Sequence, residues 1–115
     1  MKVEWLRRYC LSLPHVTEAV QWEDHLVFKL ADKSFAITTL SGEGNFCSFK
    51  ASPEDFAELI ERPGVIPAPY LARAKWVALE REDSLPPTET KKYLERAHRL
   101  VFEKLPKKTR LAMAG

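Results

Sequence analysis

Apolar positions change their spacing along this chain, and each change marks a new structural element. From Val3 to Leu13 they recur every three or four residues, which is the spacing of one buried helix face. This pattern predicts a helix over residues 3–12. Pro14 ends that helix, because its ring would clash with the preceding turn.

Three short segments rich in β-branched and aromatic residues follow, at residues 26–30, 34–40 and 46–49. Such segments are typical of strands. Residues 31–33 are short enough for a hairpin, and residues 41–45 contain two glycines that suit a second turn. The pattern therefore predicts an antiparallel meander. Residues 15–25 show neither spacing and are expected to be irregular, with Trp22 as their anchor.

The second half of the chain returns to helical spacing twice. Ser52 can cap a helix that stops before Arg62. A proline-rich loop then runs to Pro69, and residues 76–79 are predicted to form a fourth strand. Residues 88–103 form a long helix in this interpretation, and the tail adds one short turn.

The order of these elements predicts an α+β fold with two layers. Strands that follow one another, with helices outside them, argue against a doubly wound parallel sheet. We expect the N- and C-terminal helices to cover one face of the antiparallel sheet and the other face to stay partly open. With 115 residues the chain is too short for a second core, so residues 1–115 are predicted to be one domain.

Cysteine content and hydropathy narrow the class of protein. Cys10 and Cys47 lie in apolar patterns and have neither zinc-ligand spacing nor a disulfide framework. Reduced, packed thiols are typical of cytoplasmic proteins. No apolar run approaches the roughly 20 residues of a membrane span, and no signal-peptide pattern opens the chain. We expect a cytoplasmic protein with no membrane partner, metal or cofactor.

Candidate catalytic groups are few. Hydrolytic chemistry needs a nucleophile and a base that a third group orients. His15 lies beside a proline and His98 borders an apolar helix face. Glu23, Asp24 and His25 form a cluster that could bind a metal, but neighbouring residues in an extended segment point opposite ways. A solvated turn is the simpler interpretation, and we do not expect an enzyme.

Charge is distributed unevenly along the chain. Residues 1–65 hold 7 Lys and Arg against 10 Asp and Glu, a sum of −3, whereas residues 66–115 hold 11 against 6, a sum of +5. A polyanionic partner is compatible with this imbalance. A solvated helix face is compatible with it too, so charge alone does not decide the matter.

The segment at residues 67–79 carries an unusual mixture of residue types. Its two prolines hold the backbone extended, and Tyr70 and Trp76 supply aromatic faces. Arg73 and Lys75 supply positive charge beside them. Aromatic and cationic side chains in alternation can hold nucleic acid through stacking and phosphate contacts. We expect Trp76 to be buried beside its apolar neighbours and the two cations to be exposed.

Several segments spread over nearly the whole chain carry a resemblance. They are residues 28–29, 33–36, 49–53, 62–64, 67–71, 75–77 and 105–110. Together and in this order they resemble the MmcQ/YjbR family of small bacterial proteins. The resemblance implies a frataxin-like (CyaY-like) α+β fold and DNA binding through a double wing of surface loops. Two departures stand out: many relatives have Gly-Gly where this chain has Ala31-Asp32, and Glu4 is the lone acid of the first helix, so iron handling is not expected.

Two functional hypotheses follow. The first is a monomeric, non-enzymatic DNA-binding protein whose loop and tail contact the phosphate backbone, through Tyr70, Arg73, Lys75, Lys107, Lys108 and Arg110. The alternative is a small-molecule or protein-interaction module with a groove beside the 67–76 loop, lined by Trp22, Tyr70 and Trp76. An apolar concavity there, without uniformly positive charge around it, would favour the alternative.

Overall fold

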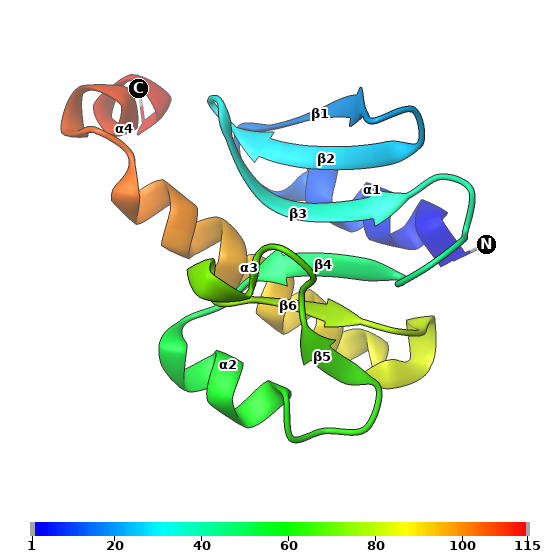
Figure 1. Cartoon of the computed structure of the whole chain (residues 1–115). Coiled ribbons are helices and arrows are strands. Elements are labelled where there is room, and N and C mark those ends of the chain that lie inside the picture. The colour runs from blue at the N-terminus through cyan, green and yellow to red at the C-terminus, as the bar shows by residue number, and fades with distance from the viewer. Residues whose placement is uncertain (1, 115) are drawn as a thin grey trace.

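Six antiparallel strands form one sheet in the order β1-β2-β3-β4-β6-β5 (Figure 1). The computed structural model describes residues 2–114. The strands are β1 (Val16–Gln21), β2 (His25–Leu30), β3 (Lys33–Thr39), β4 (Cys47–Lys50), β5 (Val65–Pro67) and β6 (Trp76–Leu79). The helices are α1 (Lys2–Ser12), α2 (Pro53–Leu59), α3 (Pro87–Lys104) and α4 (Lys107–Ala114), with 3₁₀ turns at Ala72–Ala74 and Glu82–Ser84. The α+β class predicted from the element order is confirmed.

Helices α1 and α3 lie behind the sheet, as Figure 1 shows. Between them and the strands sits the main core, in which Phe28, Phe35 and Phe49 are completely buried together with Leu94 of α3. Burying such large apolar side chains is the main favourable contribution to folding. No helix between residues 2 and 114 is both long and apolar enough to span a membrane.

The opposite face of the sheet, here called the open face, carries a smaller apolar cluster. Ladder pairing places Ile37 opposite Ser48 and Ser48 opposite Ala78, so these three residues share one face. The chain after β5 folds back over this face, and Leu71 packs against Trp76, of which 5% is exposed. The prediction that Trp76 is buried is confirmed.

The sequence did not predict strands β1 and β5. Residues 15–25 were expected to be irregular and anchored by Trp22. Both expectations are wrong, because β1 pairs with β2 along its whole length and Trp22 is 67% exposed. The alternation of apolar and polar residues that marks a strand is interrupted in β1, because the polar Glu18 faces the helices. There it accepts a hydrogen bond from Nε of Arg7 at 2.8 Å. That bond lowers the pKa of the Glu18 carboxyl. The proline-rich loop also contains β5, whose proline is tolerated because β5 is an edge strand.

The tail is more regular than the predicted short turn. Helix α4 extends over eight residues after Pro106. Met113 packs against the main core, which gives the helix an apolar anchor. Nε of Arg110 donates to the carbonyl oxygen of Leu105 at 3.1 Å and satisfies a group at the end of α3. Isolated short helices are marginal, so these tertiary contacts explain why α4 forms.

A glycine comparison tests how tightly the segment before β5 packs. Gly64 has φ +83°, and a Cβ there would lie 2.5 Å from Oγ of Ser84, whereas Gly42 has φ +79° and open space around it. We expect Gly42→Ala to cost about 1–2 kcal/mol of unfolding free energy from the left-handed backbone alone. Gly64→Ala should lose roughly 1–3 kcal/mol more through crowding. Urea unfolding of both variants measures the difference, and equal losses would contradict the packing described.

Both cysteines are buried in the main core, and their thiols are predicted to be inert. Burial raises the pKa of Cys10 from 9.0 to about 12 and that of Cys47 further. At pH 8 Cys10 should hold about one thousandth of the thiolate of an ordinary thiol. Alkylation by iodoacetamide should therefore be negligible in the native protein and rapid in urea. Fast labelling of the native protein would show that the core opens readily.

Candidate functional site

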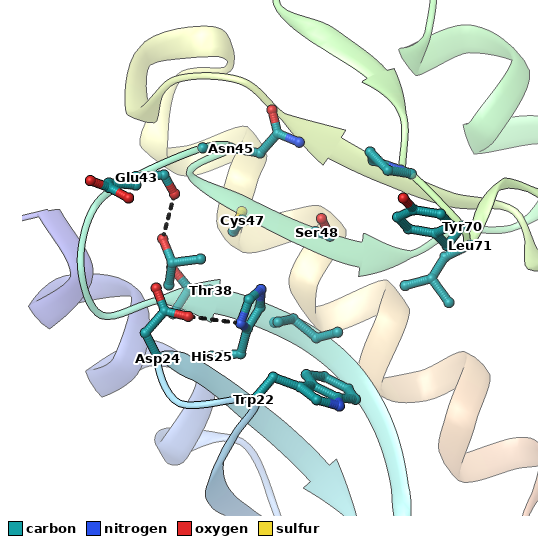
Figure 2. A pocket seen from close by; sticks show the side chains of 14 residues that line it. Trp22, Asp24, His25, Thr38, Glu43, Asn45, Cys47, Ser48, Tyr70 and Leu71 are labelled. Carbon is teal, nitrogen blue, oxygen red and sulfur yellow. Dashed lines mark hydrogen bonds and ion pairs between the residues drawn. The ribbon is translucent and has the colours of Figure 1, made fainter.

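A cavity of about 690 Å³ lies on the open face (Figure 2). It sits at the end of the sheet where β2 begins and β3 ends, between the β1–β2 turn, the β3–β4 loop and the β5–β6 loop. Its lining residues are Trp22, Asp24, His25, Ile37, Thr38, Thr39, Glu43, Gly44, Asn45, Cys47, Ser48, Pro69, Tyr70 and Leu71. We call it the aromatic cavity. The polypeptide thus builds a concave surface from three connections that are far apart in sequence.

Trp22 and Tyr70 stand on different rims of the aromatic cavity (Figure 2). Trp22 is 67% exposed and Tyr70 is fully exposed. Both have positive φ, +50° and +67°, which bulky residues adopt rarely. Such strain persists only where the surroundings impose it, and it concentrates at functional sites. Two strained, solvent-exposed aromatic residues at one cavity therefore mark it as the candidate site.

Local hydrogen bonds hold both strained turns. In the β1–β2 turn the amide of Asp24 donates to the carbonyl oxygen of Trp22 at 2.9 Å. In the β5–β6 loop the amide of Leu71 donates to the carbonyl oxygen of Ala68 at 3.1 Å. Ala68 is itself buried beneath the loop. Each aromatic side chain is thus carried by a short, internally bonded turn.

A polar network occupies one end of the aromatic cavity. Nδ1 of His25 lies 3.0 Å from Oδ1 of Asp24 and makes no hydrogen bond. Oγ of Ser41 donates to the other carboxylate oxygen of Asp24 at 2.8 Å. The indole of Trp22 meets the imidazole of His25 edge-on, with ring centroids 5.7 Å apart. Ser41 therefore orients the carboxylate of Asp24, and the imidazole of His25 lies between that carboxylate and the indole of Trp22.

The contact between Asp24 and His25 corrects an expectation. Their side chains were expected to diverge as neighbours in an extended segment. Trp22 and Glu23 both have positive φ, so the segment is a tight turn and the two side chains meet. Between residues 2 and 114, however, no group of three or more His, Cys, Asp or Glu side chains is placed to hold a metal ion. The absence of metal and of catalysis stays a prediction.

The predicted pocket residues divide between two places. Trp22 and Tyr70 line the aromatic cavity, as the alternative hypothesis required. Trp76 does not line this cavity. The β5–β6 loop folds back on itself, so Trp76 lies beneath the loop and borders another depression together with Lys50 and Lys104.

The residues proposed to contact nucleic acid also differ in their surroundings. Arg73, Lys107 and Lys108 are exposed. Lys75 is exposed too, but its Nζ lies 5.0 Å from the ring centroid of Phe56 and so is directed toward α2. Arg110 is half-buried and bonded to the end of α3, which leaves it the least available of the set.

Several encounters between residues at these sites could not be predicted from the sequence. Asp24 and Ser41 are 17 positions apart. Lys33, Lys50 and Lys104 border one depression although long stretches of chain separate them. Residue spacing predicts which side chains are neighbours within one helix or strand. These side chains instead meet because different strands pair in the sheet. Only a correct prediction of the strand register would have identified these encounters from the sequence.

Comparison with known proteins agrees with this architecture. A crystal structure of Deinococcus radiodurans protein DR2400, described as a family-model domain DUF419, superposes with a TM-score of 0.85 and 28% sequence identity. The alignment covers 98% of this chain and 88% of that one. No curated protein matches the chain significantly. The YjbR family model matches residues 11–100, a span that includes the whole sheet and both exposed aromatic residues of the cavity, and the chain therefore belongs to the YjbR family.

Proposed function

We propose that this protein is a binding module that holds a small, flat ring system in the aromatic cavity. The observation that carries the proposal is the lining of the cavity. It combines two exposed aromatic side chains with an apolar floor and a fixed carboxylate, and it contains neither Lys nor Arg. Its volume of about 690 Å³ lies within the range of about 300–1,000 Å³ that small-molecule sites occupy.

The aromatic side chains favour a planar ligand. Indole and phenol rings attract other rings through offset or edge-on contacts, which add to the effect of burying apolar area. Ile37 and Leu71 supply apolar surface between the two rims. The Trp22 ring is largely exposed to water, so contact with a ligand would bury more of its apolar area than contact with a ring already packed in a core.

Charge selects among planar ligands. Asp24 and Glu43 both line the aromatic cavity, and hydroxyl groups of Thr39 and Ser48 add acceptors and donors. A positively charged ring meets favourable Coulomb energy there, and its contact with Trp22 gains a cation–π contribution. An anionic ring meets repulsion. We therefore infer that the ligand is a cationic or neutral nitrogen heterocycle.

Three probes that share one ring system test this inference. We expect 9-aminoacridine, a cation, to bind more tightly than neutral acridine, and acridine-9-carboxylate to bind most weakly. Cation–π contact alone should separate the first two by about 1 kcal/mol, roughly fivefold. Quenching of tryptophan fluorescence reports binding at Trp22, because Trp76 is buried and Trp5 is half-buried. Equal affinities for all three probes would contradict the charge argument.

Variants locate the site. Tyr70→Ala keeps Trp22 as reporter and should weaken binding, whereas Trp22→Phe should weaken it when calorimetry is the readout. Asp24→Asn should reduce the preference for the cation and leave the part that comes from cation–π contact and from Glu43. Leu111→Ala changes another exposed apolar residue, outside the lining of the cavity, and serves as the matched control. Unchanged affinity in the Trp22 and Tyr70 variants would rule the cavity out.

DNA binding is a second candidate, which the surroundings of the loop and tail favour. None of the ion pairs between residues 2 and 114 involves Arg73, Lys75, Lys107 or Lys108. The base of the loop and the start of the tail are neighbours, since Leu71 and Leu105 line the same depression. Unpaired cations near an exposed tyrosine suit phosphate contact combined with base stacking.

Salt dependence tests the second candidate. Titration of labelled single- and double-stranded oligonucleotides at 50 and 200 mM salt should show affinity falling steeply with salt, because each neutralised phosphate releases counterions. Each of the double variants Arg73→Ala/Lys75→Ala and Lys107→Ala/Lys108→Ala should lower the salt slope by about 2. Lys91→Ala/Lys92→Ala removes equal charge from the exposed side of α3 and should leave the slope unchanged. Absence of binding at 50 mM salt would dismiss DNA as the partner.

A further inference from the structure

A second depression lies at the opposite end of the sheet from the start of β2. There β3 begins, β4 ends and β6 begins, and the C-terminal end of α3 reaches the same place. The depression has a volume of about 400 Å³ and is lined by Asp32, Lys33, Ser34, Lys50, Leu71, Trp76, Val101, Lys104 and Leu105. We call it the lysine depression. Antiparallel pairing brings the strand ends together, and the packing of α3 against the sheet adds Lys104 to the cluster.

Three lysines line this depression without an ion-pair partner. None of the ion pairs between residues 2 and 114 includes Lys33, Lys50 or Lys104. Partial burial lowers the pKa of Lys50, and the positive charge of Lys104 lowers it further. Lys50, which is half-buried, is therefore close enough to Lys104 to be repelled by it, while Lys33 and Lys104 are exposed. An anion bound between them would relieve that repulsion.

The remaining lining is mainly apolar. Trp76, Val101 and Leu105 are each 5% exposed and so are largely covered by their neighbours. Leu71 completes this part of the lining and also borders the aromatic cavity, so it separates the two sites. A ligand that exploits the whole depression must combine a charged group with an apolar body. Inorganic ions alone would leave the apolar part of the lining unused.

We propose that the lysine depression binds a small phosphate monoester with an apolar or aromatic body. Three lysines and the single Asp32 leave a local charge of two positives, which matches a phosphate monoester dianion. Ammonium-to-phosphate contacts are charge-assisted and about twice as strong as neutral hydrogen bonds. A continuous polyanion would place further phosphates next to the carboxylate of Asp32, which would repel them. The proposal is independent of the function assigned to the aromatic cavity.

The test uses 1-naphthyl phosphate as the probe and the full chain as the protein. Titration followed by amide and indole NMR signals should perturb the Trp76 indole and the amides of Lys50 and Leu105. Comparison with the spectrum of Trp22→Phe identifies the indole signal of Trp22, which should not move. 1-Naphthol and inorganic phosphate each supply half of the ligand and should bind at least tenfold more weakly. Binding of either half as tight as that of the ester overturns the proposal.

Charge variants complete the test. Lys50→Gln and Lys104→Gln should each weaken binding about tenfold or more, the effect expected for a charged hydrogen bond. Ser34→Asp adds a negative charge at the depression without touching a lysine and should abolish binding, whereas Lys91→Gln removes a distant charge and should have no effect. Wild-type affinity in the Lys50 and Lys104 variants overturns the assignment. So does a result in which these variants lose binding to an oligonucleotide while 1-naphthyl phosphate binds none of the proteins.

Discussion

Helices cover one face of this six-stranded sheet, so the other face must be completed by the connections between the strands. Phe28, Phe35 and Phe49 fill the layer between the sheet and α3, and their burial makes that layer the stable part of the molecule. On the open face the β5–β6 loop covers a smaller apolar cluster. Leu71 and Ala68 pack on Trp76, and the rest of that face remains available for ligands.

The position of this loop creates two surfaces of opposite character. Leu71 borders both, with acids and exposed aromatic rings on one side and lysines on the other. The net charge of +2 therefore conceals a local separation of charge. A charged molecule would meet a different electrostatic environment at each end of the sheet, because Coulomb interactions are local in salt solution. The two ends of the sheet therefore differ in the sign of their local charge.

Backbone strain is the device that presents the aromatic side chains. A glycine would relieve the positive φ at Trp22 or Tyr70, but it would also remove the ring. The structure retains the ring and accepts the strain, stabilised by short hydrogen-bonded turns. By contrast, the hairpin between β2 and β3 has Ala31 at φ +55° with no large side chain to present. A positive φ alone therefore does not identify a candidate site. The residue at that position must also carry a large, exposed side chain.

Helices α1, α2 and α3, four of the strands and the burial of Trp76 could be predicted from the sequence, because they depend on local spacing and on proline and capping residues, whereas α4 depends on its tertiary contacts. The sequence also suggested Trp22 and Tyr70 as ligand-binding residues from their type. It did not reveal β1, where Glu18 obscures the alternation, or the edge strand β5. Tertiary contacts bring Asp24 to Ser41 and place Lys33, Lys50 and Lys104 at one depression. Those encounters depend on strand register and loop path, which are set by packing across the sheet and leave no periodic trace along the chain.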